Sequence, residues 1–290
     1  MQVFNYCRPR NLKQVIAILS QHGPDAALLS GGTNLVVDWR AGKVNAKLWV
    51  DIFGFAELRF IEDQGACVCI GSATTMQDLA GSPVVRQFAG FLAEAAGQVG
   101  SPQIRNRATI GGNLVSASPA ADLLPPLLVL NATLLLRNAK GEKEIPLCSF
   151  LTGPKATVRQ PDEILVSVRF PKPPSGTLGR FQKIGRRRAL AISACSLALL
   201  LLNRGNRFEE IRIALGAVAP QAFRAEGVER FLLGKELSGE VIQEAAVLAA
   251  GLCHPIDDIR GTISGRKTLM QAWMAEVLSE YLPSPNFATG

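Results

Sequence analysis

The feature that most constrains this chain is a pair of glycine-rich segments at 29–35 and 108–122. Each contains two adjacent glycines together with hydroxyl and amide side chains. Because glycine has no Cβ, a ligand can approach the main chain closely at such a segment, and consecutive N–H groups can bind an anion. Taken alone, the second segment is more typical of a tight turn. Together, the two segments could clasp one long phosphate-bearing ligand from both sides.

Two common nucleotide-binding patterns are disfavoured. Neither segment has the Gly-x-Gly-x-x-Gly spacing of a dinucleotide-binding fold, and neither ends in the Gly-Lys-Ser/Thr of a P-loop. Arg105 and Arg107 lie just before the second glycine pair and could neutralise a pyrophosphate, although ordinary surface arginines are equally consistent with the sequence. The sequence therefore favours a phosphate-bearing ligand without a Rossmann fold or an ATPase site.

Three motifs resemble the FAD-binding medium subunit of the molybdenum hydroxylases, which include xanthine dehydrogenases, carbon monoxide dehydrogenase and aldehyde oxidases. They are Ser-Gly-Gly-Thr-Asn at 30–34, Thr-Ile-Gly-Gly-Asn at 109–113 with Ser-Pro-x-x-Asp at 118–122, and the segment 181–193. The match covers nearly the whole chain in order and length. The resemblance implies an α+β fold, in which a two-lobed FAD-binding domain of the PCMH type precedes a C-terminal domain of an antiparallel sheet with helices.

The resemblance also implies a site. FAD would lie between the two lobes, with its pyrophosphate held by backbone N–H groups and hydroxyls of 29–35 and 109–116. Asp122 would contact sugar hydroxyls, Leu165 would cover part of the flavin ring, and Lys183, or Gln182 beside it, would reach the isoalloxazine. Val99 stands where some family members place an aromatic residue. The implied cofactor-binding residues are Leu29, Ser30, Gly31, Gly32, Thr33, Asn34, Leu35, Val99, Thr109, Gly111, Gly112, Asn113, Ser116, Asp122, Leu165 and Lys183.

Hydrophobic periodicity and turn signals divide the chain into three parts. We expect an N-terminal α/β lobe at 1–55, a second α+β lobe at 56–175, and a C-terminal domain of an antiparallel sheet plus helices at 176–290. The proline-rich stretch 171–176 is the best linker in the sequence. We expect helices at 12–22, 84–96, 239–253 and 264–282 and a helix that starts at 75–79. We expect strands at 26–29, 48–52, 58–62, 66–70, 133–137, 164–170, 179–183, 189–202 and 208–219.

Composition excludes several functions. The formal net charge is +7, but the basic residues are scattered except for the run at 186–188, and aromatic residues are sparse, so a nucleic-acid partner is disfavoured. The six cysteines lack the spacing of a metal or iron–sulfur site, and no metal ligands are expected. The longest apolar run, 189–202, is too short to cross a membrane, and no signal peptide precedes it. We therefore expect a cytoplasmic protein.

The sequence offers no nucleophile–base pair, so no catalytic side chain is expected, and the reactive centre would be a bound organic cofactor. The resemblance implies an FAD-carrying electron-transfer subunit of a heterotrimer. A large subunit would hold the molybdenum cofactor, a small subunit would supply electrons from 2Fe–2S clusters, and NAD⁺ or another acceptor would receive them. Two alternatives stay open: a self-contained FAD-dependent oxidoreductase of the same fold, and a non-catalytic nucleotide-binding module.

Overall fold

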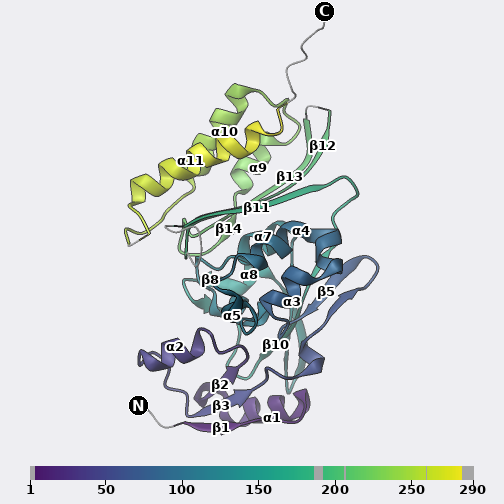
Figure 1. Cartoon of the computed structure of the whole chain (residues 1–290), viewed down its shortest axis with the longest axis vertical. Coiled ribbons are helices and arrows are strands. Elements are labelled where there is room, and N and C mark those ends of the chain that lie inside the picture. Colours follow the sequence, from purple (N-terminus) through teal and green to yellow (C-terminus); the bar gives the residue numbers. More distant parts are fainter. Residues whose placement is uncertain (1–3, 186–191, 206, 259, 283–290) are drawn as a thin grey trace, which may run out of the picture.

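A computed structural model of the chain describes residues 4–185, 192–205, 207–258 and 260–282. Three main β-sheets follow one another along the long axis of the molecule, with the N-terminal sheet at one end and the C-terminal helices at the other (Figure 1). The basic run at 186–188 and the first residues of the expected strand 189–202 lie outside the described residues. In the described part, no helix has both the length and the apolar character needed to span a bilayer.

The N-terminal lobe packs one helix on a small parallel sheet. Asn11 begins α1 (Leu12–His22), because its side chain accepts the N–H of Gln14 at 3.0 Å. The apolar face of α1 is buried against the sheet, whose strand order is β1-β3-β2. The strand β1 was not expected from the sequence. The bounds are β1 (Asn5–Cys7), β2 (Ala26–Leu29) and β3 (Leu48–Asp51).

The middle lobe is built on an antiparallel sheet of order β4-β5-β10-β6-β7. Its first hairpin turns at Gly65, which has a φ of 76° that favours glycine. The first strand begins at Ile61, later than expected, because a 3₁₀ turn (Ala56–Leu58) precedes it. The bounds are β4 (Ile61–Asp63), β5 (Cys67–Gly71), β6 (Thr133–Asn138), β7 (Gly141–Pro146) and β10 (Ile164–Pro171), with a small pair β8 (Leu151–Gly153) and β9 (Ala156–Thr157) beside them.

Helices cover this middle sheet, and several were not expected from the sequence. The expected helix at 84–96 is α4 (Pro83–Gly97), while the apolar run after Asp122 forms α7 (Leu124–Val129), although prolines stand at its start. Proline is tolerated there because the first N–H groups of a helix need no internal partner. The remaining helices are α3 (Met76–Gly81), α5 (Pro102–Arg105), α6 (Ile110–Ser116) and α8 (Leu147–Phe150).

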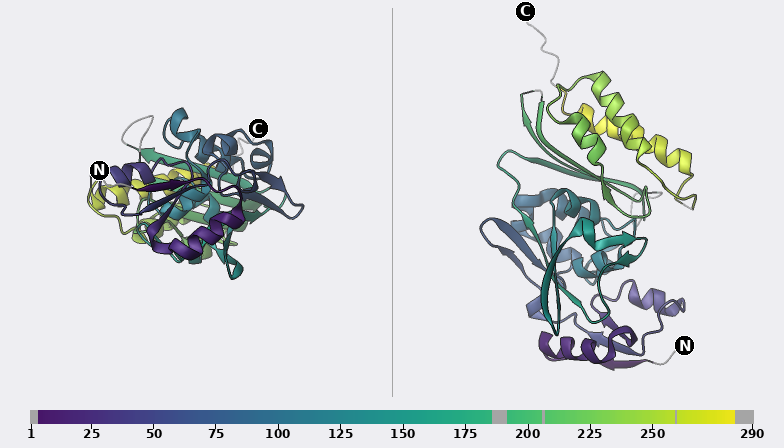
Figure 2. Two further views of the ribbon diagram at one scale, coloured as in Figure 1. Left: turned by 90° about the horizontal axis from the view of Figure 1, so that it is seen from below. Right: turned by 180° about the vertical axis from the view of Figure 1, so that it is seen from behind.

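The C-terminal domain is a four-stranded antiparallel sheet of order β11-β12-β13-β14 between two helical layers (Figure 2). The C-terminal helices cover one face, while α4 and α7 of the middle lobe pack on the other. A single apolar cluster joins the two, since Phe181, Ala198 and Leu200 are buried together with Leu124 and Leu127. The bounds are β11 (Leu178–Gly185), β12 (Ser193–Arg204), β13 (Arg207–Gly216), β14 (Phe223–Arg224), α9 (Glu226–Leu232), α10 (Gly239–Gly251) and α11 (Ile263–Ser279).

Candidate functional site

The two glycine-rich segments lie in direct contact. A Cβ on Gly31 would stand 1.8 Å from the carbonyl oxygen of Arg107, so the backbones approach at a distance that only glycine permits. The hydroxyls of Ser30 and Thr109 form a hydrogen bond of 3.1 Å between the segments. Asn34 and Ser116 form a second bond, in which the amide Nδ2 donates to the hydroxyl at 3.2 Å. The chain therefore brings the two segments together as one unit.

The first segment presents its main chain. It leaves β2 at Leu29, passes Gly32 in the left-handed region with a φ of 75°, and continues into α2 (Leu35–Arg40). That helix replaces the loop expected around Leu35, because the N–H of Val36 donates to the carbonyl of Gly32 at 3.1 Å. Among the described residues, the backbone N–H groups of 31–34 have no hydrogen-bond acceptor. They are free to donate to an anion.

The second segment presents side chains. It is a helix, α6, and Thr109 begins it by accepting the N–H of Gly112 at 3.2 Å. The N–H groups of Ile110 and Gly111 donate to the carbonyls of Thr74 and Ser72 at 3.0 and 2.8 Å. The N–H groups of 110–112 are thus already occupied, in contrast to the expectation of a loop that binds through its backbone. What this segment offers is its hydroxyls and the amide of Asn113.

Both segments line a cavity of about 720 Å³, the size range of a cofactor site. One polar atom that belongs to this wall has no partner: the side-chain oxygen of Asn113 is buried without a hydrogen bond among the described residues. An unpaired buried acceptor is costly, so this atom suits a ligand that donates to it. The expected site residues that line the cavity are Ser30, Gly31, Gly32, Thr33, Asn34, Leu35, Val99, Thr109, Gly111, Gly112, Asn113, Ser116 and Leu165.

Three expected residues do not line this cavity: Leu29, Asp122 and Lys183. Asp122 and Lys183 pair with each other instead, with 2.6 Å between the carboxylate Oδ2 and Nζ, and the hydroxyl of Ser193 donates to the other carboxylate oxygen at 2.6 Å. Burial raises the pKa of Asp122, while the positive charge of Lys183 and the Ser193 hydroxyl act in the opposite direction. This buried cluster joins the middle lobe to the C-terminal sheet.

The structure separates the two neighbours Gln182 and Lys183. The indole Nε1 of Trp273 on α11 donates to Gln182 at 2.5 Å, so this side chain lies on the outer face of the sheet. Lys183 lies on the inner face, where its Nζ also donates to the carbonyl of Gln98 at 2.7 Å. Because successive side chains of a strand point to opposite faces, only Lys183 faces the FAD-binding lobes.

Sequence reasoning missed several members of this region. Arg159 lines the cavity, and its Nη1 donates to the carbonyl of Glu163 at 2.7 Å, with burial lowering its pKa. No local pattern points to Arg159, which lies just after the short strand β9 and outside every motif of the sequence. Ser193 is the last residue of the third motif, and that position is the one signal that could have found it.

The two arginines near the second segment are engaged elsewhere. Arg105 donates to the carbonyls of Val99 and Gly100 at 3.4 and 3.3 Å, and the guanidinium of Arg107 stacks over the ring of Phe53 at 3.8 Å. Neither lines the cavity. In the described ranges, no group of three or more His, Cys, Asp or Glu side chains could hold a metal ion. The lining of the cavity thus offers backbone N–H groups, hydroxyls, the side chain of Asn113 and the guanidinium of Arg159 to a ligand.

Comparisons with known proteins define the class first. The family model described as the FAD binding domain in molybdopterin dehydrogenase matches residues 2–173. The model described as the CO dehydrogenase flavoprotein C-terminal domain matches residues 180–281. A structure of carbon monoxide dehydrogenase from Hydrogenophaga pseudoflava superposes with a TM-score of 0.92 and 33% identity, covering 95% of this chain and 96% of that chain. These matches define a two-domain, FAD-binding oxidoreductase subunit.

The curated relatives point to the same family. The carbon monoxide dehydrogenase medium chain of Hydrogenophaga pseudoflava is 35% identical over 94% of each chain. A putative xanthine dehydrogenase FAD-binding subunit of Escherichia coli K12 is 32% identical over 95% of each. Quinoline 2-oxidoreductase from Pseudomonas putida 86 has the same fold, with a TM-score of 0.91 and 28% identity over 97% of each chain. This chain belongs to the FAD-binding medium subunits of the molybdenum hydroxylase family, and its cofactor is FAD.

Proposed function

We propose that this chain carries electrons on FAD inside a molybdenum hydroxylase complex. It would accept them from 2Fe–2S clusters of a small subunit, while a large subunit with the molybdenum cofactor hydroxylates the substrate. The observation that carries the proposal is the contact of the two glycine-rich segments over one cavity, with free amides at 31–34 on one side and hydroxyls on the other. Backbone N–H donors facing hydroxyl groups across one cavity suit a ligand that carries both phosphates and sugar hydroxyls, as a flavin dinucleotide does.

Each wall of the cavity has its own part in holding FAD. The amides of 31–34 would bind the pyrophosphate, because they are unpaired N–H donors at a place without side-chain bulk. Thr109, Asn113 and Ser116 would bind sugar and phosphate oxygens from the opposite side. Leu165, which is only 4% exposed, would pack against a ring of the cofactor. The bound flavin would supply the redox chemistry, since it takes electrons singly and releases them as a pair.

Asp122 and Lys183 would act from the edge of the site. Their ion pair stands beside α7 and the carbonyl of Gln98, next to the helix end from which Val99 reaches the cavity. In this proposal Lys183 brings a positive charge close to the flavin ring, where it favours the reduced, anionic form, and Asp122 accepts hydrogen bonds from the cofactor's hydroxyls. The pair also holds the C-terminal sheet against the FAD-binding lobes.

The acceptor and the location belong to the same proposal. NAD⁺ is the acceptor that we propose, with another small acceptor as the alternative. We also propose a cytoplasmic location, which the six cysteines without disulfide bonds support, because free thiols persist in a reducing compartment.

The experiment combines the FAD-loaded chain with its partners. After anaerobic mixing with the chemically reduced iron–sulfur subunit, we expect the flavin absorbance to bleach, whereas the chain mixed with the oxidised subunit stays coloured. NADH added alone should bleach it as well if NAD⁺ is the acceptor. Failure of the reduced iron–sulfur subunit to bleach the flavin would contradict the proposal. Turnover of a small substrate by the chain alone would instead favour a self-contained oxidoreductase.

A further inference from the structure

The short helix α7 lies across the inner face of the C-terminal sheet and is held at both ends. Just before its first turn, Asp122 pairs with Lys183 on β11 and with Ser193 on β12, each at 2.6 Å. Its last turn meets β13 and β14, at the other side of the sheet. Since β11 and β14 are the two edges of the sheet, α7 fixes the sheet across its whole width. The contact at the far edge has no part in the cofactor site described above.

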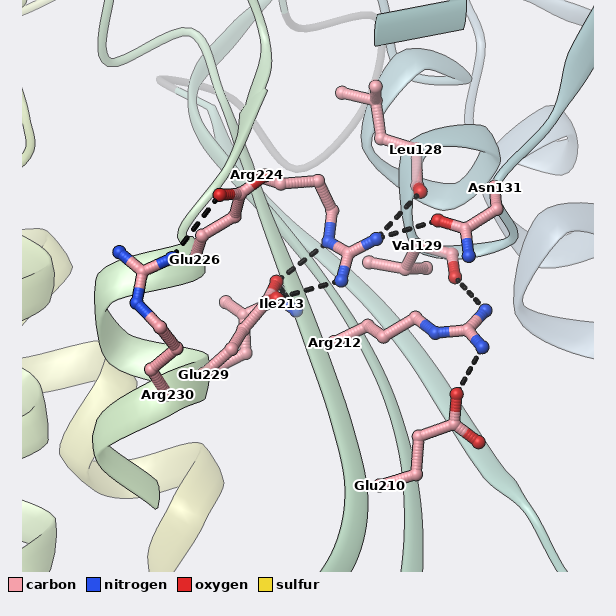
Figure 3. Close-up of polar contacts among 10 residues, drawn as sticks. All are labelled: Leu128, Val129, Asn131, Glu210, Arg212, Ile213, Arg224, Glu226, Glu229 and Arg230. Carbon is pink, nitrogen blue, oxygen red and sulfur yellow. Dashed lines mark hydrogen bonds and ion pairs between the residues drawn. The ribbon is translucent and has the colours of Figure 1, made fainter. Parts of the chain in front are cut away.

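Two arginines make that far contact, and Figure 3 shows both guanidinium groups pointing from the strands to the end of the helix. Arg224 donates from Nη1 to Asn131 Oδ1 at 2.8 Å and to the carbonyl of Leu128 at 3.4 Å. Arg212 donates from Nη1 to the carbonyl of Val129 at 3.0 Å. The last carbonyls of a helix have no partner inside it and carry partial negative charge, so cations are favoured there.

The orientation of both arginines is fixed from the side of the C-terminal domain. Glu229 on α9 holds Arg224 with two parallel bonds of 2.7 Å, to Nε and Nη2, and it also accepts the N–H of Ile213 at 2.8 Å. Glu229 is buried, so this fork is shielded from water. Glu210, on the same strand, forms a single ion pair with the Nη2 of Arg212 and is partly exposed. These pairs thus orient both guanidinium groups toward the C-terminal end of α7.

We propose that Arg212 and Arg224 form an interdomain latch, and that this latch positions Lys183 at Asp122 beside the flavin. The latch fixes the edge β14, and α7 transmits that constraint to the edge β11. Without it, the β13–β14 edge can move away from α7, and because β11, β12 and β13 are hydrogen-bonded neighbours, this movement shifts Lys183 on β11 relative to Asp122. Both arginines are positioning residues, because they touch neither the cavity nor the cofactor's binding segments. The part of this inference that concerns FAD rests on the proposed function.

The first test uses the apoprotein and needs no cofactor. Lys183 is 12% exposed and held by two acceptors, so it should react slowly with an amine-directed reagent followed by mass spectrometry. We expect Arg224→Met to raise the labelling of Lys183 at least about threefold relative to Lys143, which lies on β7 of the middle sheet and pairs with Glu163. Arg212→Met should also raise the labelling of Lys183, and this variant replaces Arg224→Met in the test if Arg224→Met does not fold. The matched control is Arg230→Ala, which loses only an exposed pair with Glu226 on the same helix.

The second test is a double-mutant cycle on FAD affinity. Arg224→Met should weaken FAD binding by about tenfold in the natural background, and by less than about twofold when Lys183 is already replaced by Met, because coupled residues are not additive. Equal losses in both backgrounds, or unchanged labelling of Lys183, would overturn the latch. If Lys183→Met leaves FAD affinity unchanged, the role of Lys183 in the proposed function fails, and the labelling result still decides whether the latch positions this side chain.

Discussion

The substitution Gly31→Ala tests the contact between the two glycine-rich segments. Its Cβ would lie 1.8 Å from the carbonyl oxygen of Arg107 and 2.6 Å from the carbonyl carbon. Both are backbone atoms, so no side chain can rotate away. The usual C···O contact is about 3.3 Å, so the segments must separate by about 1.5 Å to admit the methyl group. That separation takes the hydrogen bonds Ser30–Thr109 and Asn34–Ser116, now 3.1 and 3.2 Å, beyond bonding distance.

The expected loss of affinity follows from these contacts. A variant whose segments stay about 1.5 Å apart cannot hold FAD from both sides, so it loses the hydrogen bonds that one segment would make to the cofactor. Two hydrogen bonds to a charged group, at about 1.5 kcal/mol each, correspond to a loss of about 3 kcal/mol, which weakens binding by about 100-fold. Titration of the apoprotein with FAD, followed by flavin fluorescence, measures this change.

The matched control is Gly227→Ala on α9, where the added Cβ meets no atom within 4 Å. This control should keep the FAD affinity of the natural chain. Circular dichroism and thermal unfolding establish that both variants are folded. A folded Gly31→Ala variant with natural FAD affinity would refute the reasoning, since the segments would then not need to touch in order to bind the cofactor.

Three further substitutions or measurements test neighbouring parts of the account. Asp122→Ala leaves the ammonium of Lys183 buried without its partner and should weaken FAD binding by roughly 1–3 kcal/mol; an unchanged titration curve would exclude the role of Asp122. Gly112→Val places a branched side chain at a position that lines the cavity, so FAD retention should be lost while the C-terminal domain stays folded. Burial raises the pKa of Cys253 to about 12, so this thiol should resist alkylation at pH values where exposed Cys148 reacts, and equal labelling would contradict the packing.

Much of the fold was predictable because strong periodic patterns dominate it. The strands expected at 26–29, 133–137 and 164–170 and the two C-terminal helices follow apolar runs or helical apolar patterns, and the structure confirms them with small shifts of their ends. The family and its cofactor were also predictable, since the motif at 109–113 with Ser-Pro-x-x-Asp at 118–122 is specific, whereas the Gly-Gly-Thr of 30–34 would be weak on its own. Most of the short helices were not predicted, although α3 begins where a helix was expected at 75–79. The helices α6 and α7 were not predicted, because α6 contains a glycine pair and α7 contains two prolines, and these residues usually mark turns.

The sequence predicted which residues line the cavity better than it predicted which residues contact one another. The segments that line the cavity were identified from composition, but no sequence pattern shows that Asp122 pairs with Lys183, which lies 61 positions further along the chain. The same limit applies to the latch, where Arg224 reaches Leu128 across 96 positions. Such contacts depend on how two domains pack, and periodicity within one element carries no information about that packing.

The most direct measurement compares the affinities of the apoprotein for FAD and for riboflavin. Riboflavin keeps the ring and the ribityl chain but lacks the pyrophosphate that the free amides of 31–34 are proposed to bind. At least two hydrogen bonds to a charged group, at about 1.5 kcal/mol each, predict that FAD binds about 100-fold more tightly or better. Gly31→Ala should reduce this preference. Equal affinity for the two flavins would contradict the claim that the two segments close over a dinucleotide.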